Sequence, residues 1–312
     1  MRSERLFRFG AQLSFAGSRA EWVAKARRVE ELGFSTLCVP DHFDDQLAPM
    51  VALSAAACAT TTLRVATLVL DNDYRHPLLV AKEAATLDLL SGGRFELGLG
   101  AGWLATDYEQ SGIPCDRPAV RIDRLEEALA VVKGLLAGGR FSFDGRYYRV
   151  RDHPGTPVPQ QRPRPPLLVG GGGRRILSLA GREADIVSVN FDLRSGSVGP
   201  QVGATATAEL TAEKVRWVRE AAGDRFDDVE LSYTAYMTMV TDDRDAVAAG
   251  LGSGFGLTAE EVVAMPNFAI GTVAQIADEL ERRRDSLGLS YVVVGGECHE
   301  AMAPVVERLA GR

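Results

Sequence analysis

The sequence is poor in the residues that bind metals or form cross-links. Its 312 residues include only four cysteines and four histidines. The cysteines, Cys38, Cys58, Cys115 and Cys298, show no CxxC spacing, so neither a zinc site nor a disulfide framework is predicted, and we expect reduced thiols. No HExxH or GxSxG motif is present, and no histidine and carboxylate share metal-ligand spacing. These absences argue against metallohydrolases and serine hydrolases, and no bound metal is expected.

The sequence also lacks long apolar runs and an excess of positive charge. No window approaches the roughly 20 apolar residues of a membrane span, and the first residues lack the apolar core of a signal peptide. A cytoplasmic location without a membrane partner is therefore expected. The net charge of −7 argues against nucleic acids and anionic membranes as partners. The content of 46% hydrophobic and 25% charged residues is that of an ordinary globular protein.

What the sequence does contain is a regular alternation of apolar strand-like runs and helical segments. Helix starts are marked by Ser18 with Glu21, Thr258 with Glu261 and Thr272 with Gln275. The alternation predicts a (β/α)8 barrel forming a single domain over residues 1–312, with a doubly wound parallel sheet as the alternative. The predicted strands are Phe9–Leu13, Thr36–Val39, Val65–Leu70, Phe95–Leu99, Leu167–Val169, Ile186–Val189, Leu231–Val240 and Tyr291–Val294.

The clearest unit lies between residues 65 and 103. Val65–Leu70 is apolar without alternation, as in a strand buried on both faces, and Pro77 opens a helix that Gly92 and Gly93 end. Phe95–Leu99 forms the next strand, and glycines at 98, 100 and 102 leave its end without side chains. We expect a flat ligand to approach the backbone there.

Three segments stand apart from the alternation. Residues 141–166 read as an insertion, with a β-hairpin around Asp144 and Gly145 followed by a proline-rich stretch. Arg194–Ala204 and Gly250–Gly256 are rich in small residues, and either is a candidate for a mobile lid.

Candidate functional residues follow the predicted strands, where barrel enzymes place their active sites. His42 comes directly after the second strand and could exchange a proton, although an isolated histidine is often structural. The adjacent Asp41 could equally be a turn residue. His76, next to Pro77, reads mainly as a residue of the helix start.

A second candidate site follows the fifth predicted strand. The run Gly170–Gly173 precedes Arg174 and opens a helix, so free backbone amides and a cation could bind a phosphate. A flexible turn with solvated arginines explains the same residues. Gly295 and Gly296, after the last strand, compete for the phosphate role because many barrels bind phosphate there.

Several segments resemble the bacterial luciferase-like superfamily. The signature region is YRHPLLVAKEAATLDLLSGGRFELGLGAGW, and similar support comes from AEWVAKARRVEELGFSTLCVPDHF, RIDRLEEALAVVKGLL, PLLVGGGGRRILSLAGREADIVSV and IGTVAQIADELERRRDSLGLSYVVV. The resemblance implies a (β/α)8 barrel with an insertion before strand five. It also implies a pocket for reduced FMN or the 5-deazaflavin coenzyme F420 at the C-terminal rim.

The cofactor decides the reaction that the resemblance implies. Family members with FMN are monooxygenases fed by a separate reductase, whereas members with F420 transfer hydride to or from an organic substrate. We expect the F420-dependent reaction on a small organic molecule, with an FMN-dependent monooxygenase as the alternative and a non-catalytic flavin-binding barrel as a third possibility. A homodimer is expected, since dimers are the commonest homo-oligomers.

The resemblance also assigns roles to individual residues. It implies that His42 lies beside the reactive ring as the proton donor, and that Leu68 and Val69 form a bulge that often holds a non-prolyl cis peptide. Trp103 stands where several F420-dependent dehydrogenases have a glutamate acid, which disfavours a sugar-phosphate dehydrogenase; it could stack on the substrate or serve packing. The implied cofactor-binding residues are Asp41, Leu68, Val69, Asp71, Gly100, Ala101, Gly102, Gly170, Gly171, Gly172, Gly173 and Arg174.

Overall fold

The computed structural model describes residues 5–197 and 199–312. Its main sheet is a closed parallel barrel. The series of hydrogen-bonded strands begins with β3, and its last strand of full length is β5. These two strands also pair with each other, which closes the sheet. This closure confirms the predicted barrel, and it shows that the doubly wound alternative is wrong, since an open sheet keeps two unpaired edges. The barrel strands are β1 (Arg8–Gln12), β2 (Thr36–Val39), β3 (Arg64–Thr67) continued by β4 (Leu70–Asp71), β5 (Phe95–Gly100), β8 (Leu167–Gly171), β9 (Ile186–Val189), β10 (Glu230–Ala235) and β13 (Leu289–Val294).

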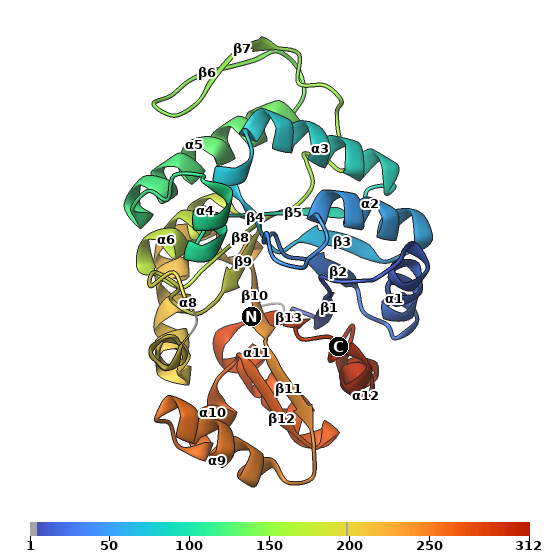
Figure 1. The fold of residues 1–312 in the computed structure, drawn as a ribbon, viewed down its shortest axis with the longest axis vertical. Coiled ribbons are helices and arrows are strands. Elements are labelled where there is room, and N and C mark those ends of the chain that lie inside the picture. The colour runs from blue at the N-terminus through green and yellow to red at the C-terminus, as the bar shows by residue number, and fades with distance from the viewer. Residues whose placement is uncertain (1–4, 198) are drawn as a thin grey trace.

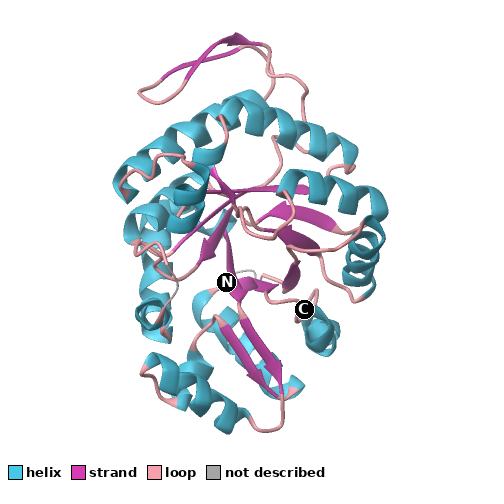
Figure 2. Ribbon diagram, in the orientation of Figure 1, coloured by secondary structure: helices cyan, strands magenta, loops and turns pink. Residues whose placement is uncertain are grey.

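The helices form a layer outside the barrel (Figures 1 and 2). The strands are consequently covered on both faces, and β2, β5 and β13 are buried along their whole length. The covering helices are α1 (Arg19–Glu31), α2 (Pro49–Ala59), α3 (Pro77–Leu90), α5 (Pro118–Leu136), α6 (Arg174–Glu183), α8 (Ala208–Ala222), α11 (Val273–Leu287) and α12 (His299–Leu309). Shorter helical segments are α4 (Ala105–Ser111), α7 (Pro200–Gly203), α10 (Ala259–Ala264) and the 3₁₀ turns Asn72–Tyr74, Ala204–Ala206 and Gly223–Asp228.

The helix starts agree closely with the sequence signals. Thr258 and Thr272 each form a reciprocal capping box with the residue three positions later. Ser18 accepts a hydrogen bond from the Glu21 amide, but the Glu21 carboxylate accepts from the Gly17 amide instead of completing a box. His76 is the N-cap of α3 and accepts from the amide of Leu78, so its predicted place at a helix start is confirmed.

One predicted strand is divided in the structure. The run Leu231–Val240 breaks at Tyr236 into β10 and β11 (Met237–Val240), and β11 pairs in parallel with β12 (Phe268–Gly271) in a separate two-stranded sheet. Figure 1 shows this sheet projecting from the barrel beside α9 (Arg244–Phe255) and α10.

The prediction of a glycine-rich loop at Gly250–Gly256 is wrong. Residues 250–255 belong to α9, and Gly256 ends the helix with a left-handed φ of 68°. The glycine at 252 serves close packing, because a Cβ there would lie 2.3 Å from the Leu257 carbonyl oxygen.

The other predicted segments take the following forms. The hairpin is present as β6 (Phe141–Asp144) and β7 (Arg149–His153), and the Gly145 amide donates to the Tyr148 carbonyl at 2.9 Å. Arg194–Ala204 contains α7, while its residue 198, like residues 1–4 of the N-terminal segment, lies outside the described part. Within the described part, no helix has the length and apolar character to cross a membrane.

A buried ion network closes the N-terminal end of the barrel. Glu96 is 1% exposed and accepts from Arg8 at 2.7 Å and Arg64 at 2.6 Å, while Arg8 also donates to Glu230. The network joins the starts of β1, β3, β5 and β10. It lies at the barrel end opposite to the cavity described next.

Candidate active site

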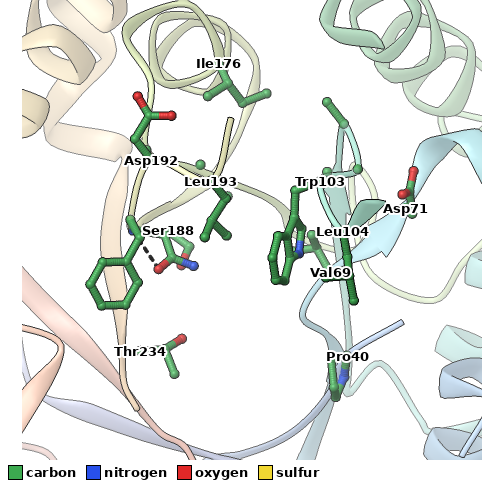
Figure 3. Close-up of a pocket in the computed structure, with 18 of the residues that line it drawn as sticks. Pro40, Val69, Asp71, Trp103, Leu104, Ile176, Ser188, Asp192, Leu193 and Thr234 are labelled. Atoms are coloured by element: carbon green, nitrogen blue, oxygen red, sulfur yellow. Dashed lines mark hydrogen bonds between the residues drawn. The ribbon is translucent and has the colours of Figure 1, made fainter. Parts of the chain in front are cut away.

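A cavity of about 720 Å³ opens at the carboxyl ends of the barrel strands. Every site residue predicted from the sequence lines it. Figure 3 shows Val69, Asp71 and Trp103 among them. Leu68, Val69 and Asp71 follow β3, whereas Ala101 and Gly102 follow β5, so side chains from distant parts of the chain meet at one rim. The complete predicted set is Asp41, His42, Leu68, Val69, Asp71, Gly100, Ala101, Gly102, Trp103, Gly170, Gly171, Gly172, Gly173 and Arg174.

His42 is held by a carboxylate that the sequence interpretation missed. Its Nδ1 lies 2.7 Å from Oδ2 of Asp107, which is 2% exposed. The same carboxylate accepts from the Tyr74 hydroxyl at 3.2 Å and from the Phe43 amide at 3.3 Å. The buried carboxylate therefore fixes the imidazole and directs its other nitrogen, Nε2, away from Asp107.

Asp107 had no usable signal in the sequence. It lies in the first turn of the short helix α4, where an acidic residue is usually explained by the helix dipole. His42 is 65 residues away in the chain, and only the closed barrel brings the loops after β2 and β5 together.

Asp41 binds Arg75, a second partner that was not predicted. Arg75 donates to both carboxylate oxygens, with Nη2 3.0 Å from Oδ1, and the Asp71 amide donates to Oδ2 at 3.0 Å. Asp41 thus joins the end of β2 to β4 while it borders the cavity.

Asp71 is a buried carboxyl group, 6% exposed, beside other acidic groups. Burial, with further contributions from the Asp73 and Asp41 carboxylates, raises its pKa to about 7, although the Asp73 amide and the Tyr108 hydroxyl donate to it at 2.8 and 3.0 Å. Asp71 can therefore exist in either protonation state near neutral pH.

The peptide bond between Leu68 and Val69 is cis, the form that the resemblance describes as frequent at this bulge. The chain bulges here between β3 and β4, and Val69 lies against β5. A Cβ on Gly98 would be 2.0 Å from the Thr67 carbonyl oxygen, and a Cβ on Gly100 would be 2.6 Å from Val69 Cγ2.

The glycines at the end of β5 and just after it are also required by packing. At Gly102, where φ is 72°, a Cβ would lie 1.9 Å from the Tyr108 hydroxyl. The missing side chains of Gly98, Gly100 and Gly102 thus make room for protein atoms. Gly100 and Gly102 also border the cavity, and the approach of a ligand to their backbone stays a prediction.

The glycines at the end of β8 and just after it divide into two kinds. A Cβ on Gly172 would lie 1.9 Å from the Phe191 carbonyl oxygen, so this position is filled by protein. At Gly170 the nearest atom would be 3.5 Å away, and at Gly173 it would be 3.9 Å away, so a Cβ at either would make only ordinary van der Waals contacts. Gly173 is the N-cap of α6, whose first amides border the cavity.

The arginines near this helix start have carboxylate partners. Arg174 lies 3.6 Å from Glu220, and Arg175 binds Asp123. The competing pair, Gly295 and Gly296, is not among the described residues that line the cavity. Trp103 packs edge-on against His42, with ring centroids 5.7 Å apart and an interplanar angle of 87°.

Comparison with known families agrees with this architecture. Residues 5–260 match the model of the luciferase-like monooxygenase family. The chain belongs to this family. The resemblance expected from the signature region is thereby confirmed.

The luciferase-like relatives include both cofactor types. Over 310 residues the chain is 29% identical to an F420-dependent glucose-6-phosphate dehydrogenase of Amycolatopsis mediterranei, covering 91% of this chain and 83% of that protein. Over 142 residues it is 33% identical to an FMNH(2)-dependent dimethylsulfone monooxygenase of Pseudomonas putida, covering 46% of this chain and only 39% of that protein.

Solved luciferase-like structures show the same fold. The F420-dependent tetrahydromethanopterin reductase of Methanopyrus kandleri has a TM-score of 0.77 at 21% identity, covering 98% of this chain and 99% of that one. EDTA monooxygenase from Chelativorans has a TM-score of 0.77 at 15% identity, covering 98% and 93%. The barrel is therefore shared by members that carry out different reactions.

Proposed function

We propose that this luciferase-like barrel is an oxidoreductase that binds reduced F420 and transfers hydride between it and a small organic substrate. The observation that carries the proposal is the position of His42, held at Nδ1 by Asp107 2.7 Å away on the border of the cavity. An acid–base group is thus already oriented in the cavity that Leu68 and Val69 also line. The F420-dependent Amycolatopsis relative, matched over 91% of the chain, supports the choice of cofactor.

The residues of the cavity fit a flat ring that carries a phosphate-containing tail. Leu68, Val69 and the end of β5 form one wall, against which the ring would lie. Gly170 and Gly173 line the cavity without side chains, and α6 begins at Arg174 on the same side, where its first backbone amides have no acceptor within the helix. These amides and Arg174 would hold the phosphate.

When bound, the reduced coenzyme would supply the hydride, and the protein would supply position and a proton. His42 would donate the proton from Nε2, while Asp107 holds the proton on Nδ1 and keeps the ring in place. Asp71, whose pKa is near 7, would face the polar edge of the ring. Trp103 would exclude water from the face of His42 that it covers.

Three broader expectations belong to the same proposal. The chain would act as a single domain in the cytoplasm, where its four free cysteines stay reduced. It would form a homodimer through α2 and α3, because Val51 on α2 is 73% exposed and Leu90 on α3 is 66% exposed. The molar mass in solution tests the dimer, with Val51→Glu expected to favour the monomer.

A second candidate function is an FMN-dependent monooxygenase supplied by a separate reductase. The observation in its favour is the 33% identity to the Pseudomonas protein across the barrel segment that the two share. A barrel that binds a flavin without catalysis is the third possibility, because a fold alone does not determine a reaction.

The deciding experiment is a fluorescence titration of the purified protein with F420 and, separately, with FMN, each in oxidised and reduced form. Tight binding of F420 alone is expected. Preference for reduced FMN, followed by substrate-dependent oxygen uptake, would replace the proposal with the monooxygenase. Binding of F420 without turnover over a broad panel of hydride acceptors would favour the non-catalytic barrel. His42→Ala serves as the matched control, since it should keep coenzyme binding and lose turnover.

A further inference from the structure

The lining of the cavity is not uniform in charge. Among the described lining residues, the cationic side chains are Arg121, Arg174, Arg175 and Arg194. Arg174 and Arg175 stand at the start of α6. Arg194 binds Asp192, whose Oδ2 would lie 3.9 Å from a Cβ on Gly173. Three of the four cations are therefore gathered at the end that we assign to the coenzyme phosphate.

Arg121 is committed to the protein backbone. Its guanidinium donates to the carbonyl oxygens of Ala101 at 3.0 Å, Gly102 at 3.3 Å and Asp116 at 2.8 Å. These bonds hold the turn after β5 in place. Each lining cation of the described part thus already has acceptors on the protein before a substrate binds: backbone carbonyls for Arg121 and carboxylates for the other three.

The other end of the cavity is apolar. Figure 3 shows Trp103, Leu104 and Leu193 directed into the space in front of the strand ends. The rings of Phe191 and Tyr236 stack with centroids 5.7 Å apart and planes inclined by 25°. Flat aromatic surfaces therefore border this end, where a flat ligand could lie against them.

Uncharged polar groups border the cavity at the ends of β9 and β10. They belong to Ser188, Asn190 and Thr234. The Asn190 amide donates to the Tyr236 hydroxyl at 2.8 Å, which fixes the stacked ring. These groups can form hydrogen bonds to a carbonyl or hydroxyl, but they cannot neutralise a charge.

The apolar surface continues outside the cavity along β11. Met237 lines the cavity and is 40% exposed, and Met239, two positions further on the same face, is 46% exposed. Methionine side chains adapt to ligands of varied outline. Met237 and Met239 thus extend the apolar lining toward solvent.

From this distribution we infer that the substrate of the proposed reaction is a neutral, largely apolar molecule with a flat conjugated part, and not a sugar phosphate or another anion. The inference rests on the proposed function, because it assigns the charged end of the cavity to the coenzyme. Moving an unpaired carboxylate out of water is strongly unfavourable, so an anion should bind at least about tenfold more weakly than its neutral analogue.

A matched pair of ligands tests the inference. Methyl cinnamate and cinnamate share one flat skeleton and differ by a negative charge, and glucose 6-phosphate serves as a polar anion. Their dissociation constants are measured by calorimetry on the protein saturated with oxidised F420, so no turnover takes place. The ester should bind at least about tenfold more tightly than the carboxylate, and glucose 6-phosphate should not displace it.

Two variants place a cation inside and outside the cavity. Leu193→Arg should strengthen cinnamate binding and reduce the preference for the ester. Leu210→Arg, on α8 and 37% exposed, adds the same charge away from the cavity lining and should leave the preference unchanged.

Several results would overturn the inference: equal affinities, tighter binding of cinnamate, displacement of the ester by glucose 6-phosphate, or no binding of the ester. Failure of F420 itself to bind would instead refute the proposed function. The same titrations on the protein without coenzyme would then still measure the preference for charge, so the two failures can be told apart.

Discussion

Replacing Asp107 by asparagine tests how His42 is positioned. Asp107→Asn keeps the size of the side chain but removes the negative charge that faces His42 Nδ1 at 2.7 Å. It also allows an amide N–H to point at Nδ1, which would favour the wrong tautomer of the imidazole. The Tyr74 hydroxyl, 3.2 Å from the same oxygen, still has a partner, so we expect the fold to survive.

The size of the effect follows from the kind of bond that is lost. A hydrogen bond to a charged group contributes about 1.5–3 kcal/mol, which corresponds to about 10- to 150-fold in rate if it acts fully in proton transfer. Removal of the proton donor itself, in His42→Ala, should lower turnover by about 10²- to 10⁴-fold. Because Asp107 acts through His42, the double variant should be no slower than His42→Ala.

The assay is single-turnover reoxidation of bound reduced F420 by an enone acceptor, followed by absorbance, with the coenzyme dissociation constant measured for each variant. Asp116→Asn is the control, since this carboxylate binds Arg124, is 43% exposed and does not line the cavity. If the rate losses of the two single variants multiply in the double variant, the positioning role is refuted. An unchanged rate in His42→Ala would remove His42 from the reaction altogether.

Three further changes probe the site and the barrel. Gly170→Ala should fold normally and weaken F420 binding by about tenfold. Gly172→Ala should lower the melting temperature, because the new Cβ would lie 1.9 Å from a backbone oxygen. Equal melting temperatures of the two variants would contradict this prediction. The raised pKa of Asp71 means that the folded protein binds this proton more tightly than the unfolded chain does. Its contribution to the free energy of unfolding therefore falls as the pH rises from about 4 to about 7. In urea unfolding, Asp71→Asn should remove that decrease, and an unaltered pH profile would contradict the burial argument. Glu96→Gln should lower the free energy of unfolding by about 3–5 kcal/mol by removing the carboxylate that pairs with Arg64 and one of the two that pair with Arg8, and a change below about 1 kcal/mol would show that solvent replaces the carboxylate.

Local patterns in the sequence were sufficient for most elements of the barrel. Strands such as β2 and β13 are continuous apolar runs because both faces are covered, and Thr258 and Thr272 mark helix starts through bonds within a few residues. The sequence pattern failed where one continuous apolar run forms two strands that pair with different neighbours. Leu231–Val240 looks uniform, yet its second half leaves the barrel at Tyr236 to pair with β12.

The glycine signals were harder to interpret from the sequence. Gly98 and Gly170 both lie near a strand end at the rim, but a Cβ on Gly98 would collide with the Thr67 carbonyl, whereas a Cβ on Gly170 would make only ordinary van der Waals contacts. The difference depends on which backbone lies opposite, and that backbone belongs to a strand far away in the chain. A glycine therefore predicts a close approach, while only the fold shows what approaches.

The dependence on distant parts of the chain also explains why one residue of each functional pair was not predicted from the sequence. His42 depends on Asp107, and Asp41 depends on Arg75, with each partner carried by a different loop of the rim. Such pairing neutralises charge at the wall of the cavity before any ligand arrives, which is necessary because an unpaired buried charge is strongly unfavourable. Among the described lining residues, the arginines at the start of α6 are paired with carboxylates in the same way. The arrangement that orients the proton donor thus favours a neutral substrate, so disruption of a pair should weaken both rate and selectivity.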